Sequence, residues 1–131
     1  MTEFLTLDDV LTLHEGSIAR FGGDAGIKDL GLLKSALSMP EATFDGAELH
    51  QTLAEKAGAY FFHVVKNHAF VDGNKRTGLA CALVFLELNG HRFVATDEEL
   101  IALTLEVASG VRSKSSVAVA IAAGREQLAR E

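Results

Sequence analysis

Apolar residues return every three or four positions over most of the chain, and short stretches of turn-forming residues separate these periodic segments. The clearest case lies between Gln51 and Asn67, where the recurring apolar residues are Leu53, Ala57, Tyr60, Phe61, Val64 and Val65. That spacing places apolar side chains on one face of a helix. We therefore predict a helix over this segment that buries one face in the core.

Start and stop signals set the limits of the other helices. Thr96 with Glu99 three residues later forms a capping box, and glycine pairs or Asn-Gly mark helix ends. The remaining predicted helices run from Leu7 to about Phe21, from the N-cap Asp29 to the residue before Pro40, from the N-cap Asn74 to about Leu88, from Asp97 to about Ser109, and from the cap Ser113 through VAVAIAAG.

The segments between these helices are short. Residues 39–50 are rich in turn formers and predict an irregular connector, and residues 91–95 predict a short extended piece. No internal repeat or linker divides the chain. We predict an all-α fold, a single compact domain over residues 1–131 with about six helices around a buried central helix, Asn74–Leu88.

Composition narrows the function class. The chain has 131 residues, a net charge of −6 and 48% hydrophobic residues, which is typical of one globular domain. An acidic chain without a basic face predicts no direct nucleic-acid partner. The N-terminus lacks the pattern of a signal peptide, no apolar run is long enough to span a membrane, and Cys81 is the one cysteine. We expect a cytoplasmic domain with no membrane partner and with Cys81 buried as a small apolar residue.

Two adjacent cations stand at the start of the predicted helix Asn74–Leu88. A helix N-terminus carries partial positive charge, so Lys75 and Arg76 are unfavourable there unless an anion lies between them. Gly73 lets a ligand approach the backbone closely, and the free N–H groups of the first turn form an anion site. With the Asn74 amide as a further donor, the pattern predicts a cradle for phosphate groups.

The residues just before this helix add further chemistry. His68, at the end of the preceding helix, can accept a proton from a hydroxyl when its imidazole is neutral. Asp72 beside a polyphosphate suits Mg²⁺, which takes one or two carboxylates together with phosphate oxygens. Phe70 between them is expected to anchor the loop in the core. A base, a metal ligand and a phosphate cradle in one segment are typical of phosphoryl transfer.

Each of these residues also has a structural interpretation. His68 could satisfy a carbonyl at a helix end, Asp72-Gly73 is an ordinary turn, and the two cations could be solvated surface charges. A metal hydrolase is a weaker alternative. Five histidines are many for this length, but His63 and His68 are badly spaced to share a helical face, and there is no HExxH motif. We interpret His63 as a structural residue.

At these positions the sequence resembles a known family. The run His68-Ala69-Phe70-Val71-Asp72-Gly73-Asn74-Lys75-Arg76 resembles the Fic/Doc superfamily signature H-x-F-x-(D/E)-G-N-G-R, in the form of its death-on-curing (Doc) toxin branch. Lys75 in place of the second glycine, and Leu79 in place of a second arginine, are both features of that branch. Residues 22–40 are similar to a second segment of the branch, although Lys28, Lys34 and Met39 depart from its usual Arg, Glu and Arg.

The resemblance implies a role for each site residue. His68 would be the general base, Asp72 would hold Mg²⁺, and Gly73, Asn74, Lys75 and Arg76 would bind the phosphates of ATP. It also implies the toxin of a type II toxin–antitoxin system. This toxin would be an ATP-dependent protein kinase that modifies a hydroxyl of a translation factor, elongation factor Tu, and so arrests translation. The implied partners are that substrate and a cognate antitoxin, whose C-terminal segment would bind as a helix in a groove.

Two other functions stay open. The first keeps the fold and transfers AMP instead of phosphate, as Fic relatives with the second glycine mostly do; Lys75 argues against it. The second is a binding module without catalysis, which the intact His68, Asp72 and Asn74 argue against.

Overall fold

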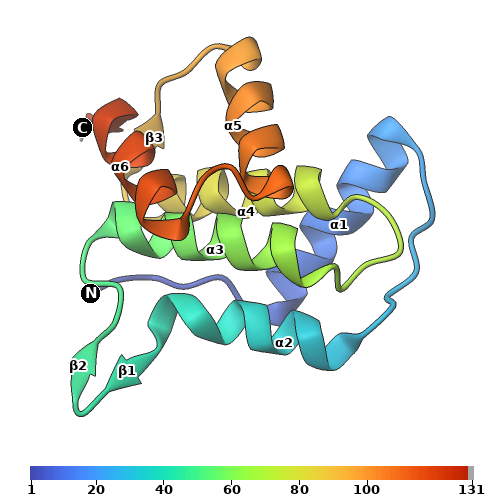
Figure 1. Ribbon diagram of the computed structural model, residues 1–131, viewed down its shortest axis with the longest axis horizontal. Helices are drawn as coiled ribbons and strands as arrows, with labels where there is room; N and C mark the ends of the chain where they lie inside the picture. Colours follow the sequence, from blue (N-terminus) through green and yellow to red (C-terminus); the bar gives the residue numbers. More distant parts are fainter. Residues whose placement is uncertain (130–131) are drawn as a thin grey trace.

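Helix α3 (Leu53–Asn67) lies at the centre of the fold in the computed structural model, which describes residues 1–129. It contacts α2 (Leu30–Ser38) on one side, α4 (Asn74–Leu88) on another and α6 (Lys114–Gly124) on a third (Figure 1). The predicted apolar face is buried, including Tyr60, Phe61 and Val65. The all-α class is confirmed, with a buried helix at the centre of the fold.

The helix at the centre is α3, whereas the sequence pattern pointed to α4. Small residues explain the difference, because Gly58 lets α6 approach so closely that a Cβ there would lie 3.3 Å from the backbone nitrogen of Ala118. α4 packs against α3, against α1 (Leu7–Phe21) and against α5 (Asp97–Ser109), and its remaining surface is only partly covered. At Gly78 a Cβ would come 2.5 Å from Val65 Cγ2, so this glycine sets the α3–α4 separation.

Most helix limits follow the caps read from the sequence. Thr96 forms the predicted capping box with Glu99, and Ser113 caps α6. α3 begins at Leu53 rather than Gln51, because the Thr52 hydroxyl accepts from Glu55 N and makes Thr52 the N-cap. The N-cap prediction at Asn74 is wrong. Gly73 is the cap of α4, in the left-handed conformation with φ 82°.

Short strands form in the predicted irregular connector, in the predicted extended piece and after the last predicted helix. The connector contains a turn of 3₁₀ helix, η1 (Met39–Glu41), and a small hairpin of β1 (Thr43–Phe44) and β2 (Ala47–Glu48). The predicted extended piece forms β3 (His91–Phe93), which pairs antiparallel with β4 (Arg125–Gln127) after α6. These pairs lie at the periphery and leave the helical core unchanged (Figure 1).

The core between the helices is apolar and closed. Phe85 and Tyr60 pack together in it, with ring centroids 5.1 Å apart, and the Tyr60 hydroxyl accepts a hydrogen bond from Leu5 N. Cys81 is buried as predicted, and burial raises the pKa of its thiol to about 12. Among the helices of residues 1–129, none is long and apolar enough to cross a membrane.

Candidate active site

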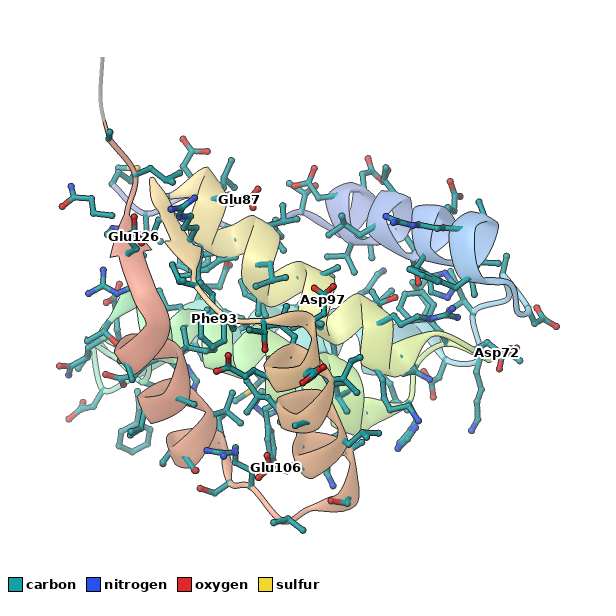
Figure 2. The ribbon with its side chains drawn as sticks, turned by 90° about the horizontal axis from the view of Figure 1, so that it is seen from above. Asp72, Glu87, Phe93, Asp97, Glu106 and Glu126 are labelled. Atoms are coloured by element: carbon teal, nitrogen blue, oxygen red, sulfur yellow. The ribbon has the colours of Figure 1, made fainter. Side chains whose placement is uncertain are left out.

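The loop between α3 and α4 opens into a pocket of about 540 Å³. Its lining residues are His68, Val71, Asp72, Gly73, Asn74, Lys75, Arg76 and Ala108. All six residues predicted from the sequence to form the site therefore face one space. Figure 2 shows Asp72 at the tip of this loop, where the chain turns into α4.

His68 ends α3 in a conformation that presents its ring to solvent. It is the C-cap residue, in the left-handed region with φ 50° and ψ 46°. This conformation is uncommon for a residue with a side chain and turns the backbone sharply out of the helix. The imidazole is exposed and makes no hydrogen bond to any described residue. The structure therefore does not support the alternative interpretation, in which the His68 ring hydrogen-bonds a carbonyl at the helix end.

The start of α4 provides backbone donors toward the pocket. Gly73 caps the helix without a side-chain hydrogen bond, and the first intrahelical bond here runs from Thr77 N to Gly73 O at 2.9 Å. No side chain therefore accepts a hydrogen bond from the backbone N–H groups that precede Thr77 in this first turn. Gly73 is needed for its positive φ and also for space, because a Cβ would lie 3.3 Å from Ile18 Cδ1.

Asn74 braces the loop with its side chain. Its Oδ1 accepts from Phe70 N at 3.0 Å, and its Nδ2 donates to Phe70 O at 2.9 Å. The Asn74 amide is therefore largely occupied by backbone, and what this residue offers the pocket is mainly its own N–H at the helix start. Phe70 is buried, which confirms the predicted anchor.

Asp72 is held at two of its oxygens. Its carboxylate Oδ2 accepts from Asp24 N at 2.8 Å, and its backbone carbonyl accepts from Nε2 of His14 at 2.8 Å. Oδ1 remains for a cation. Within residues 1–129 no group of three or more His, Cys, Asp and Glu side chains forms a metal cage. A single carboxylate beside a helix N-terminus would suit Mg²⁺ only if the ion took its other ligands from a bound phosphate and water.

The two cations of the motif differ in their contacts. Arg76 donates from one terminal nitrogen to Gly22 O at 3.0 Å, and its guanidinium lies 5.2 Å from the centre of the Phe21 ring. Lys75 is exposed and forms no ion pair with a described carboxylate. Lys75 thus carries a charge without an ion-pair partner among the described residues, while Arg76 also ties α4 to the end of α1.

His14 is a residue of this site that the sequence analysis missed. It is 1% exposed, and its ring stacks on Phe70 with centroids 3.7 Å apart and planes 8° apart. Because the Asp72 carbonyl can only accept, the His14 Nε2 must carry the proton in their hydrogen bond. A signal was available, since His14 lies one turn from Val10 on the buried face of α1, where a polar group needs a partner.

The segment 22–29 holds the loop from the other side. The amides of Lys28 and Asp29 both donate to Ala69 O, and Val71 N donates to Gly26 O. Gly23, with φ 116°, lies so close that a Cβ would be 3.1 Å from Asp72 Cβ. The second segment of the family resemblance is therefore the one that packs on the motif loop.

Together these features define an all-α domain in which a cationic helix start without a side-chain cap lines the same pocket as an exposed histidine. The model of the Fic/DOC family matches residues 4–86. The chain is 47% identical over 95 residues to "Toxin Doc" of Mycolicibacterium smegmatis, which covers 72% of this chain and 71% of that protein. It is 36% identical over 111 residues to "Protein kinase doc" of Escherichia phage P1, covering 85% and 86%. The chain belongs to the Fic/DOC family.

Proposed function

We propose that this protein is the toxin of a type II toxin–antitoxin pair and an ATP-dependent phosphotransferase that acts on a protein hydroxyl. The observation that carries the proposal is the pocket in which His68, Asp72 and the start of α4 meet. The names of the two relatives support it, since one is a toxin and the other a protein kinase. Such a toxin would act in the cytoplasm, where translation takes place.

The residues would divide the reaction as follows. His68 accepts the proton of the acceptor hydroxyl, whose oxygen then bonds to the γ-phosphorus of ATP while the bond to the β,γ-bridging oxygen breaks and ADP leaves. The first N–H groups of α4 and the ammonium of Lys75 hold the phosphate oxygens. Asp72 would hold Mg²⁺, which neutralises phosphate charge when bound.

The exposed, unbonded imidazole of His68 suits a macromolecular acceptor. A protein hydroxyl can reach it from solvent without a lid having to open, because His68 lies at the rim of an open pocket. We propose a translation factor as substrate, with elongation factor Tu as the first candidate to test, on the basis of the branch resemblance.

The antitoxin would cover a groove beside the site. Between α4 and α5 lies a depression of about 200 Å³ lined by Leu79, Ile101, Leu105 and Thr104, with Lys75 and Arg76 at its rim. Ile101 and Leu105 are one helical turn apart and are 59% and 54% exposed. An amphipathic helix with acidic residues at one end would bury the apolar pair and neutralise the cations.

A transfer assay tests the reaction. Purified protein, Mg²⁺, elongation factor Tu and ATP labelled at either the α or the γ phosphate would be incubated, with His68→Ala alongside. We expect a labelled acceptor from γ-labelled ATP only, and a loss of at least about 100-fold in His68→Ala. Label from the α phosphate would mean adenylyl transfer instead. Full activity in His68→Ala would contradict the proposed base.

A further inference from the structure

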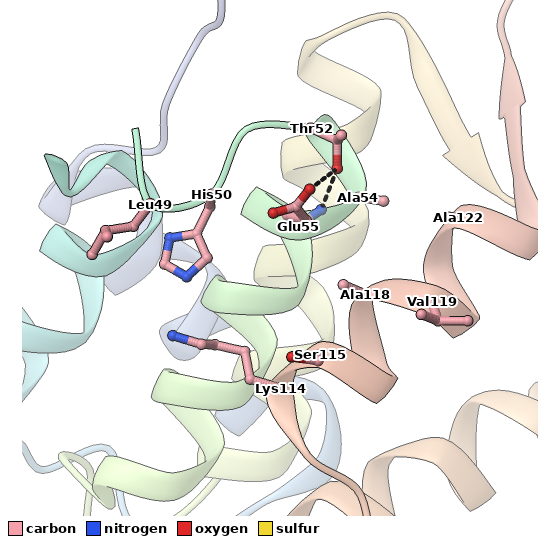
Figure 3. Close-up of a pocket in the computed structure, with 10 residues that line it drawn as sticks. All are labelled: Leu49, His50, Thr52, Ala54, Glu55, Lys114, Ser115, Ala118, Val119 and Ala122. Atoms are coloured by element: carbon pink, nitrogen blue, oxygen red, sulfur yellow. Dashed lines mark hydrogen bonds between the residues drawn. The ribbon is translucent and has the colours of Figure 1, made fainter. Parts of the chain in front are cut away.

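A second pocket lies away from the motif and is larger than the candidate active site. It has a volume of about 610 Å³ and contains none of the motif residues. The end of the connector, the first turn of α3 and one face of α6 line it: Leu49, His50, Thr52, Ala54, Glu55, Lys114, Ser115, Ala118, Val119 and Ala122 (Figure 3). Its size is in the range of ligand sites, and nothing in the proposed reaction uses it.

One end of this pocket is cationic. The Lys114 ammonium lies 3.2 Å from Nε2 of His63, and it forms no ion pair with any carboxylate of residues 1–129. Figure 3 shows the His50 ring and the Lys114 amine extending toward each other at the same end. His50 is only 6% exposed, and its ring makes no hydrogen bond to another described side chain. Nδ1 of His50 has no hydrogen-bond partner among the described residues, so this end offers one unpaired imidazole nitrogen and an ammonium without a carboxylate partner.

His50 is held in place by a buried lysine. Lys56 is 2% exposed, and its ammonium donates to His50 O at 2.6 Å, to Gln51 O at 3.2 Å and to Glu48 Oε2 at 3.1 Å. Three hydrogen bonds from one buried ammonium fix the backbone on which the His50 ring stands. The Lys56 charge is matched by Glu48, so it adds little net charge to the pocket.

The balance of charge selects the ligand. Burial and the nearby Lys114 lower the pKa of His50, and the same two causes lower the pKa of His63 to about 4. Both imidazoles are therefore neutral near pH 7, and Lys114 supplies the single unmatched positive charge. Glu55 lines the same pocket, and its negative charge works against the lowering of the His50 pKa; its carboxylate accepts a hydrogen bond from the Thr52 hydroxyl at the start of α3 (Figure 3). Because this carboxylate lines the pocket, it repels a singly charged anion beside Lys114 less than it repels a polyphosphate.

We propose that this pocket binds a carboxylate attached to a short apolar group. The carboxylate lies against Lys114 and the ring of His50, and the apolar part lies on the floor formed by Ala54, Ala118 and Ala122. The carboxylate can come from a free monocarboxylic acid or from an acidic side chain of a bound peptide.

Binding can be followed without any activity assay. Butyrate and its neutral analogue butyramide would be titrated into the full-length protein while the ring C2–H signals of His50 and His63 are recorded by NMR at pH 7. We expect saturable shifts with butyrate and binding at least about tenfold weaker with butyramide, because an ionic hydrogen bond to Lys114 is lost. Equal effects of the two probes would overturn the proposal.

Three variants locate the charge, and a peptide separates the two sources. Lys114→Gln should weaken butyrate binding at least about tenfold, Lys114→Arg should retain it, and Lys34→Gln, at an exposed position on α2, should leave it unchanged. Unchanged binding by a folded Lys114→Gln would overturn the proposal.

The peptide acetyl-Ala-Glu-Ala-amide, compared with the same peptide carrying Gln in place of Glu, tests the peptide source. Tighter binding than butyrate favours a peptide, weaker binding favours a free acid, and no shift with either probe rejects the site.

Discussion

At the residue scale, the hydrogen bond between His14 and the Asp72 carbonyl is the contact whose removal best tests how the site is positioned. His14→Phe keeps an aromatic ring against Phe70 and removes the hydrogen bond to the Asp72 carbonyl. We expect kcat for γ-phosphate transfer to fall about tenfold or more, since small displacements of a catalytic group are costly. KM for ATP should change less, because the helix start remains. Initial rates over a range of ATP concentrations separate the two effects.

A matched variant distinguishes positioning from general stability. His14→Gln retains a side-chain N–H donor and loses the ring stack, so it should recover part of kcat even though a stacked aromatic pair is lost. If His14→Phe and His14→Gln lose kcat in proportion to their loss of unfolding free energy in urea, His14 only stabilises the fold. That result would remove it from the site.

Lys75 and Arg76 are expected to behave differently despite being neighbours. Lys75→Ala should raise KM for ATP about tenfold and leave the urea midpoint unchanged, since Lys75 is exposed and unpaired. Arg76→Ala should lose activity and also about 1 kcal/mol of stability, because it donates to Gly22 O and lies over Phe21. Equal urea midpoints for both variants would contradict the tie that Arg76 makes to α1.

The sequence could indicate the site residues that are adjacent in the chain, and it could not indicate those that arrive from elsewhere. Residues 68–76 form one motif, and all of its proposed site residues line the pocket. His14 and Asp24 lie 58 and 48 residues from Asp72 along the chain, and only folding brings them together. The local role of Asn74 was also misjudged, because its bond to Phe70 depends on the exact path of the loop.

At the element scale, the α3–α4 contact depends on a glycine. Gly78→Ala places a Cβ 2.5 Å from Val65 Cγ2 and 3.1 Å from Phe61 O, so the two helices must separate. We expect a net loss of up to about 2 kcal/mol of unfolding free energy, from overpacking of about 1–3 kcal/mol set against a gain in helix propensity of about 1 kcal/mol. Urea unfolding followed by circular dichroism measures it.

Gly16→Ala is the control for this change. Gly16 also lies inside a helix, but nothing lies within 4 Å of a Cβ built there. The substitution should stabilise the protein by about 0.5–1 kcal/mol through helix propensity alone. Two shifts of the same sign would mean that α3 and α4 adapt to the added methyl group.

Elements follow from the sequence where local rules decide them. The capping residues Thr96 and Ser113 and the apolar period of α3 gave these helices to within two residues. β4 was not predictable because its residues become a strand only by pairing with β3, which lies more than 30 residues earlier. The central position of α3 was not predictable either, because it comes from how closely α6 can approach Gly58.

At the scale of the whole molecule, we propose that the chain unfolds as one unit. The buried face of α3 is shared by its contacts with α2, α4 and α6, so the loss of any one of these contacts would expose part of the same core. Circular dichroism and the fluorescence of Tyr60 should give coincident urea transitions. A separate early transition in one signal would show that the domain is divided.

Stability of the whole molecule should also depend on pH through His63 and His50. Both have a pKa below the usual 6.5 when folded, that of His63 about 4 because of burial, Lys114 and His50. As the pH falls below 6.5, the unfolded chain binds protons that the folded protein does not, so stability decreases until about pH 4. At His50 the charge of Glu55 opposes the lowering of the pKa, and the charge of Lys56 adds to it.

His63→Gln cannot gain a proton at this position, so its urea midpoint should fall less between pH 7 and pH 5 than that of the unaltered protein. If the urea midpoints of the two proteins fell by the same amount between pH 7 and pH 5, His63 would have to accept a proton in the folded state. Its contact with Lys114 would then break when it does.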